Sequence, residues 1–143
     1  MEWIKNWFSN MLPFDSPMIY QGIAFNTVEN FYQAMKIKDI EGRKKLAAMD
    51  PYKAKKAIRD KINFTWREDW TKDMSLQVME YALRYKFRPG NSWGKKLIET
   101  GNEEIIEWNN WNDTFWGKNV TTKEGENHLG IILMKIREDI KNG

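Results

Sequence analysis

The sequence contains no cysteine, and this absence excludes both a disulfide framework and a cysteine-ligated metal centre. It contains a single histidine, His128, which excludes a histidine-rich metal site and argues against a histidine-based catalytic triad. No apolar run is long enough to cross a bilayer, and the first residues lack the apolar region of a cleavable signal. We therefore expect a soluble, cytoplasmic protein without a metal site and without a membrane association.

Several common catalytic motifs are also missing. The sequence has no glycine-rich phosphate loop, no HExxH zinc motif and no GxSxG nucleophile motif. Helical patterns do not alternate with strands, so a Rossmann or P-loop architecture is excluded as well. Acid–base chemistry in this chain must therefore come from carboxylates, lysines or tyrosines.

What the chain does contain is a large aromatic content in a short length. Its 143 residues are 41% hydrophobic, with eight tryptophans and seven phenylalanines, which predicts one packed domain over residues 1–143. The net charge is +3, from 23 basic and 20 acidic residues. A balance this close to neutral permits an anionic ligand but does not by itself indicate nucleic-acid binding.

Apolar spacing predicts a mainly α-helical fold with a small β element, of the α+β class. Pro13 and Pro17 indicate an irregular loop, which a small hairpin around Gln21-Gly22 follows. Thr27 is predicted to cap a helix whose core side is Val28, Phe31, Tyr32 and Met35, whereas a different face holds Glu29, Gln33 and Lys36.

Further helices follow from caps and stops. They are predicted from Pro51, from Thr65 or Asp73 to about Phe87, from Asn91 or Ser92 to Gly101, and from about Asn127 onward. The inward side of the longest one is predicted to be Met74, Val78, Tyr81, Ala82 and Tyr85. Residues 103–109 fit either a short strand or a helix.

The stretch W-N-N-W-N-D-T-F-W-G at 108–117 is too rich in amides for a core strand and too rich in indoles for an exposed loop. Considered alone, Asp113 suits an Asx turn, and Trp108 and Trp111 suit the core. Glu29, considered alone, suits the first turn of a helix, where a carboxylate interacts favourably with the helix dipole. Asn127 lies at a helix start, where amide groups attract phosphate or carboxylate.

Seven short motifs, taken together and in order, resemble the NADAR family of YbiA-like proteins. They are F-S-N at 8–10, T-V-E-N-F-Y-Q-A-M-K at 27–36, A-K-K-A-I-R at 54–59, K-F at 86–87, T-G at 100–101, D-T-F-W-G at 113–117 and G-E-N-H-L-G-I-I-L-M-K-I-R at 125–137. The resemblance extends from Trp7 to Arg137. One position departs from the family pattern, because Ile58 stands where a glycine often precedes the arginine.

This resemblance implies a compact, mainly helical domain that cleaves N-glycosidic bonds without a metal or redox cofactor. Some members of the family act on early riboflavin-pathway intermediates, splitting ribose phosphate from a pyrimidine amine, and others remove ADP-ribose from modified guanine in nucleic acid. The implied partner is accordingly a phosphorylated ribosyl or ADP-ribosyl small molecule, or an ADP-ribosylated nucleic acid. A binding module without turnover and a purely structural protein are the alternatives from other functional classes.

The family motifs also imply site residues. Glu29 and Asp113 would be the catalytic carboxylates, of which one activates water and the other stabilises the sugar cation or protonates the leaving group. We expect direct attack by water, and the division of the two roles stays open. The residues implied in substrate binding are Phe8 and Trp116 for stacking, Ser9, Asn10 and Asn127 for hydrogen bonds, Lys36 and Arg59 for phosphate, and Gly117 for close backbone approach.

Overall fold

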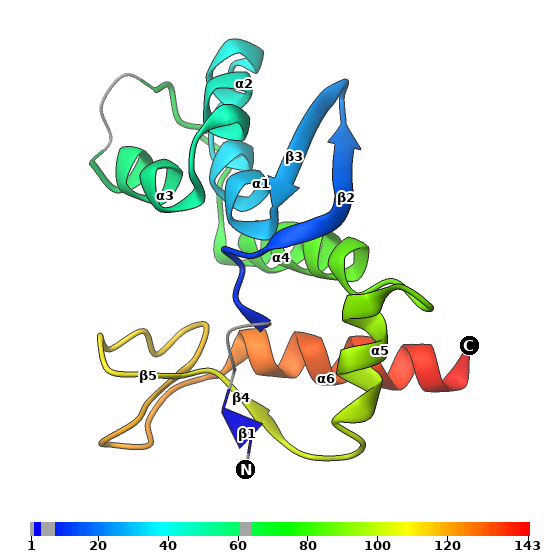
Figure 1. The fold of residues 1–143 in the computed structure, drawn as a ribbon. Helices are drawn as coiled ribbons and strands as arrows, with labels where there is room; N and C mark the ends of the chain where they lie inside the picture. Colours follow the sequence, from blue (N-terminus) through cyan, green and yellow to red (C-terminus); the bar gives the residue numbers. More distant parts are fainter. Residues whose placement is uncertain (1, 4–7, 61–63) are drawn as a thin grey trace. The chain divides into compact units, whose positions relative to one another are not determined.

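The computed structural model describes residues 2–3, 8–60 and 64–143 (Figure 1). The chain divides into a central unit, Asn10–Lys86, and a terminal unit, which combines Met1–Ser9 with Phe87–Gly143. Six helices and short strands make up the described residues, which confirms the predicted mainly α class with a small β element. No helix in the described part of the chain is long and apolar enough to cross a membrane. A single domain over 1–143 stays a prediction.

The central unit begins with a β-hairpin of β2 (Pro13–Tyr20) and β3 (Ile23–Thr27). Gln21 and Gly22 join the strands with φ angles of 50° and 77°, as a tight two-residue hairpin turn requires. The hairpin is longer than predicted. Proline cannot donate a hydrogen bond to a neighbouring strand, so a strand tolerates it at its first residue or where the pairing is irregular. The register shifts between Pro13 and Met18, which allows β2 to contain both of its prolines.

Helix α1 (Val28–Met35) lies at the centre of this unit and is buried along its whole length. The Thr27 hydroxyl accepts a hydrogen bond from the Asn30 N–H at 3.0 Å, which confirms the predicted cap. Around α1 pack α2 (Ile40–Ala48), α3 (Pro51–Asp60), α4 (Lys72–Lys86) and β3. Three of its buried side chains are polar, namely Glu29, Asn30 and Gln33, and each of them therefore needs polar partners in the interior.

Asn30 ties α1 to the end of α2. Its amide nitrogen donates to the carbonyl oxygens of Leu46 at 2.8 Å and Met49 at 2.9 Å, and its amide oxygen accepts from the Thr27 hydroxyl at 2.6 Å. One side chain thereby satisfies two carbonyls at the end of a helix, where backbone oxygens have no partner within the helix itself. Helix α2 itself was not predicted.

The predicted helices at Pro51 and at Asp73 are confirmed, whereas the alternative start at Thr65 is wrong because α4 begins at Lys72. The predicted inward face of α4 is only partly right. Tyr81 is 51% exposed, while Met79 and Leu83 lie in the core. The buried face of α4 is therefore rotated in part from the face that the aromatic spacing predicted.

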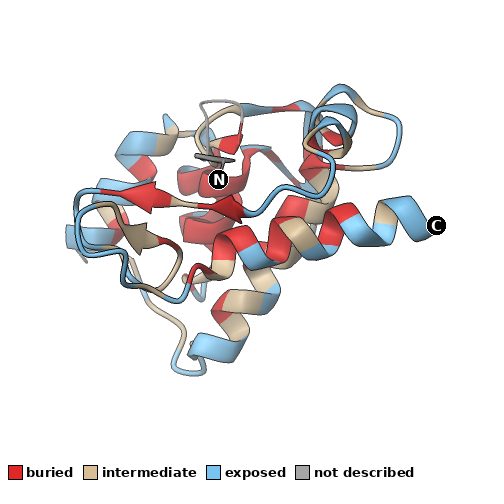
Figure 2. Cartoon of the chain, turned by 90° about the horizontal axis from the view of Figure 1, so that it is seen from below, coloured by how far each residue is buried: buried red, intermediate tan, exposed pale blue. Residues whose placement is uncertain are grey.

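The terminal unit contains α5 (Ser92–Glu99) and α6 (His128–Asn142), which pack together. Asn91 caps α5 by accepting from the Gly94 N–H at 2.7 Å, and Gly101, at φ 66°, follows its end as predicted. The apolar stripe of α6 is buried along one side, as the alternating colours of Figure 2 show, and comprises Leu129, Ile132, Leu133 and Ile136.

Short parallel strand pairs complete this unit. Strand β4 (Ile105–Ile106) pairs with β1 (Glu2–Trp3), and β5 (Trp108–Asn109) pairs with β6 (Lys118–Asn119). The open choice for residues 103–109 is thus resolved as strand. Trp108 is buried as expected, but Trp111 is 65% exposed, so its prediction as a core residue is wrong.

Candidate active site

Glu29 is a buried carboxylate in the first turn of α1, with 7% of the residue exposed. Its backbone N–H donates to the carbonyl oxygen of Asn10 at 3.0 Å, and its Oε2 accepts from the Gln33 amide at 2.5 Å. Burial raises the pKa of Glu29, while the Gln33 hydrogen bond and the charges of Lys55 and Lys36 act in the opposite direction. A carboxyl group whose pKa burial has raised can hold or take up a proton closer to neutral pH, which suits general acid–base chemistry.

Lys36 follows α1 and lies among aromatic rings. Its ammonium is 4.7 Å from the ring centroid of Tyr32, 5.7 Å from that of Trp66 and 6.0 Å from that of Trp70. Burial lowers the pKa of Lys36, the charge of Glu29 raises it, and the charge of Lys55 lowers it further. The rings stabilise the cation through their negative faces while they exclude water, so Lys36 is placed to attract an anionic group close to Glu29.

Two buried amide oxygens near Glu29 lack hydrogen-bond partners among the described residues. They are Oδ1 of Asn10 and Oε1 of Gln33. The same two amides donate elsewhere, to the Met79 sulfur and to Glu29, so each side chain is held while its oxygen is left over. Buried acceptors without a partner are rare in proteins. Oxygens of this kind suit the hydroxyl or amine donors of a sugar or a base.

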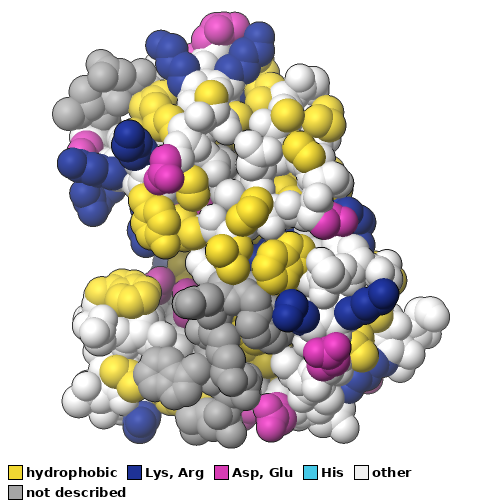
Figure 3. All heavy atoms as spheres, in the orientation of Figure 1, with side chains coloured by type: hydrophobic (Ala, Val, Ile, Leu, Met, Phe, Trp, Pro, Cys, Tyr) yellow, Lys and Arg dark blue, Asp and Glu magenta, His cyan; other side chains and the backbone are white. Residues whose placement is uncertain are grey.

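Lys55, on α3, is a member of this cluster that the sequence did not identify. Its charge acts on both Glu29 and Lys36. Arg59, on the same helix, was the predicted phosphate ligand, but its side chain is 68% exposed and pairs with Asp60 at 3.6 Å. The exposed residues of α3 include four basic ones, and Figure 3 shows basic groups beside hydrophobic and acidic ones in this part of the surface. Of the four, only Lys55 is named among the charges that act on Glu29. The role of Arg59 stays a prediction.

In the terminal unit, Asp113 forms the turn that its sequence context indicated. Its Oδ1 accepts from the N–H groups of Phe115 at 3.2 Å and Trp116 at 3.0 Å. The Asn109 amide holds the turn from the other side, donating to the Asp113 carbonyl at 2.8 Å and accepting from its N–H at 2.9 Å. No described residue donates to Oδ2 of Asp113, so this oxygen of the turn is available to interact with a ligand.

The residues after Asp113 fasten the start of α6. The carbonyl oxygens of Phe115, Trp116 and Gly117 accept from the N–H groups at 128, 129 and 127, over 3.0–3.3 Å. These three amides are therefore occupied within the chain, and attraction of an anion at this helix start stays a prediction. A side chain at Gly117 would lie 2.0 Å from the Glu107 carbonyl oxygen, so the close approach that this glycine permits is to its own chain.

Asn127 also bonds within its own unit. Its Oδ1 accepts from the Glu107 N–H and its amide nitrogen donates to the Ile105 carbonyl, both at 2.9 Å. Phe8 is fully buried against Phe87, with ring centroids 6.1 Å apart. Trp116 packs edge-on against Phe115 and is half-buried, as is Ser9. The substrate-binding roles of these residues stay predictions.

The structure brings together the predicted residues of the central unit: Asn10, Glu29 and Lys36 lie in one cluster, which Gln33 and Lys55 complete. A signal for Gln33 was present in the sequence, because Glu29, Gln33 and Lys36 repeat at helical spacing on a face apart from the apolar one. Within the described residues, no three side chains of His, Cys, Asp or Glu come together as a metal site would require.

A model of the NADAR domain matches residues 2–141. An N-glycosidase of Nostoc punctiforme is 34% identical over 139 residues, which cover 94% of this chain and 85% of that protein. A riboflavin biosynthesis protein of Vibrio vulnificus is 33% identical over 121 residues, covering 84% of this chain but only 32% of that longer protein. The NMR structure of the E. coli protein YbiA superposes with a TM-score of 0.79 at 30% identity, covering 95% of this chain and 78% of that one.

Proposed function

The chain belongs to the NADAR domain family, and from this premise we propose that it is an N-glycosidase that hydrolyses a ribose C1–N bond. The proposed substrate is a ribosylamino-pyrimidine phosphate of riboflavin biosynthesis, a pathway named for the Vibrio vulnificus relative. The observation that carries the proposal is the Glu29 cluster around α1. It combines the buried carboxyl group of Glu29, the Lys36 ammonium near aromatic rings, and two buried amide oxygens without a hydrogen-bond partner.

The chemistry of the bond explains why such a cluster is useful. Cleavage of a C1–N bond develops positive charge on the sugar, and a nearby carboxylate stabilises that charge. A water molecule must also lose a proton as it attacks, and the leaving nitrogen must gain one. Two carboxyl groups can divide these tasks, as they do in O-glycosidases.

In our proposal, Glu29 handles the proton and Asp113 stabilises the developing sugar cation. The raised pKa of Glu29 makes it a stronger proton acceptor than an exposed carboxylate, and its Oε1 is not used by the Gln33 hydrogen bond. Asp113 is held by backbone N–H groups through one oxygen only. Its fixed Oδ2 suits an electrostatic role, since preorganised charge needs no rearrangement during the reaction.

The remaining cluster residues would bind the substrate. Lys36 and Lys55 would attract its phosphate, and the oxygens of Asn10 and Gln33 would accept from ribose hydroxyl groups. The aromatic rings around Lys36 would exclude water and thereby strengthen the electrostatic attraction between these lysines and the phosphate.

The test measures release of ribose 5-phosphate from a ribosylamino-pyrimidine phosphate. Glu29→Gln and Asp113→Asn keep the shape of each side chain and should lower turnover about 10²- to 10⁴-fold, the usual contribution of general acid–base catalysis. Glu41→Gln, on the exposed start of α2, is the matched control and should be unaffected. Full activity in both carboxylate variants would exclude the assignment.

Parallel assays separate the alternatives. An oligonucleotide that carries ADP-ribose on guanine tests the related hydrolase activity by release of ADP-ribose. A titration with ADP-ribose tests for a binding module. If the wild-type protein binds ADP-ribose but turns over neither substrate, the proposal of an enzyme is refuted.

A further inference from the structure

A cavity of about 470 Å³ lies in the central unit, and no residue assigned to the candidate active site lines it. Its wall consists of Tyr20, Gln21, Met35, Lys38, Arg43, Arg67, Glu68 and Asp69. The volume falls in the range of small-molecule binding sites. The residues come from the hairpin turn, the end of α1, the first half of α2 and the segment before α4.

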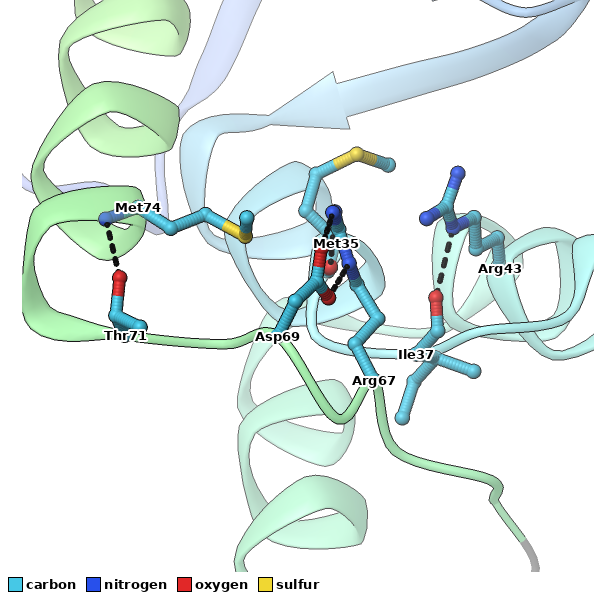
Figure 4. A network of polar contacts seen from close by, with 7 residues as sticks. All are labelled: Met35, Ile37, Arg43, Arg67, Asp69, Thr71 and Met74. Carbon is cyan, nitrogen blue, oxygen red and sulfur yellow. Dashed lines mark hydrogen bonds and ion pairs between the residues drawn. The ribbon is translucent and has the colours of Figure 1, made fainter.

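Arg43, on α2, brings a buried positive charge to this wall. The residue is 8% exposed. Its Nε donates to the Ile37 carbonyl at 2.9 Å (Figure 4). Its Nη1 donates to the Gln21 amide oxygen at 2.8 Å. A guanidinium has five N–H donors, so three remain without a partner among the described residues. Burial and then the charge of Arg67 lower the pKa of Arg43, whereas electrostatic interactions with Tyr20 and Asp39 raise it. No described carboxylate lies within ion-pair distance of its guanidinium.

Arg67 and Lys38 add to this charge. Arg67 holds Asp69 through two N–H donors at 2.9 Å each, and its third nitrogen donates to the Met35 carbonyl at 3.4 Å. Lys38 is exposed at the rim. With three basic groups and two acids, Glu68 and Asp69, the wall has a net charge of +1, and Asp39, outside the wall, partly offsets the charge of Arg43.

A structural role accounts for part of this arrangement. Both arginines donate to carbonyl oxygens at or just beyond the end of α1, a site where basic side chains stabilise helices. That role uses one N–H of each guanidinium. It leaves the remaining N–H donors of Arg43 accessible from the cavity, where they are available to an anion.

We propose that this cavity binds a phosphate group, either free or on a small molecule. Guanidinium groups match phosphate oxygens with paired donors, and an ammonium adds a point charge. The cavity exceeds the volume of phosphate alone, and Tyr20 and Met35 provide an apolar wall for an attached organic group. The site goes beyond the proposed function, because it uses none of the residues assigned to the reaction.

The test is calorimetric titration of the full chain at constant ionic strength with inorganic phosphate, glycerol 3-phosphate and unphosphorylated glycerol. Arg67→Gln removes a cation from the wall, and Arg43→Lys keeps the charge but loses the paired donors. Lys45→Gln, exposed on the same helix and outside the wall, changes the charge equally and serves as control. Circular dichroism confirms that each variant is folded, and Lys38→Gln provides a rim variant with no role in packing.

We expect both phosphate compounds to bind and glycerol not to bind, with affinity about tenfold lower in Arg67→Gln and Arg43→Lys. Tighter binding of glycerol 3-phosphate would identify an organic phosphate as the occupant, and equal binding would identify free phosphate. Binding that Lys45→Gln weakens as much as the wall variants would refute the proposal, as would no binding at all. Lys55→Gln, which removes a cation of the candidate active site and none from the cavity wall, should leave this affinity unchanged. If it alone abolishes binding, the ligand lies in the candidate active site and the cavity proposal fails, whatever the turnover assays show.

Discussion

Replacing Asn30 by alanine tests whether polar bonding inside the central unit fixes α1, the helix that carries Glu29. Asn30 is 1% exposed, and its amide makes hydrogen bonds to two carbonyl groups and one hydroxyl. Alanine favours a helix, so the intrinsic propensity of α1 would improve. A net loss of stability would therefore come from the lost bonds.

The size of the loss follows from which groups are left without a partner. The Leu46 carbonyl still accepts from the Met49 N–H at 3.3 Å, so it is only weakened. The Met49 carbonyl loses the donor that Asn30 supplied, and the Thr27 hydroxyl loses the acceptor for its proton although it still accepts from the backbone N–H of residue 30. A buried polar group without a partner costs about 1–3 kcal/mol, and we expect Asn30→Ala to lower the free energy of unfolding by about 2–5 kcal/mol.

Urea unfolding followed by tryptophan fluorescence measures this loss. With a mid-range dependence on denaturant of about 2 kcal/mol per molar urea, the midpoint should fall by roughly 1–2.5 M. Asn26→Ala, at an exposed position of β3, removes the same amide and should change stability by less than about 0.5 kcal/mol. A midpoint for Asn30→Ala that matches the Asn26→Ala control would refute the claim that these bonds hold α1 in place.

Three further variants have definite expected outcomes. Because the pKa of Glu29 is raised in the folded protein, its contribution to stability is fully present below the unfolded pKa near 4.5 and is lost as pH rises through the folded pKa. Glu29→Gln should therefore be more stable than the wild type at neutral pH and lose that advantage near pH 4. Urea unfolding midpoints at both pH values would show this. Asp69→Asn frees Arg67, whose ion pair with Asp69 is exposed to solvent, so urea unfolding should hardly change while phosphate binds more tightly in calorimetry. Gly130→Ala should destabilise by about 3 kcal/mol or more in thermal unfolding despite the better helix propensity of alanine, because its side chain would lie 2.1 Å from the Ile105 carbonyl oxygen.

Local signals in the sequence predicted the helices that have clear caps and stops. Thr27 and Asn91 act within their own turn of helix, and Gly101 adopts a conformation that glycine favours, so neighbouring residues suffice to identify them. Helix α2 lacks a clear apolar repeat and includes Gly42, so apolar spacing does not identify it. A local signal is present, because the Asp39 side chain caps the helix by accepting from the Gly42 N–H at 2.8 Å. Packing against α1 and β3 adds contacts that the local sequence does not contain.

The same limit applies to the candidate site. Helical spacing placed Glu29 and Lys36 on one face, and the structure confirms that each acts on the charge of the other. Lys55 was missed because its link to them depends on how α3 packs on α1, which spacing within one helix cannot show. The turn at Asp113 was predictable because an Asx turn closes over a few residues.

Segment 65–67 pairs with residues 36–38 across a single antiparallel bridge between Ile37 and Trp66. In extended chain, consecutive side chains point to opposite faces, and here Trp66 joins the rings around Lys36 while Arg67 joins the cavity wall. A one-residue deletion just before Trp66 would turn Trp66 toward the cavity and Arg67 toward Lys36, and would thereby disable both sites together. Substitutions can therefore alter either site separately, whereas a change of length in this segment cannot.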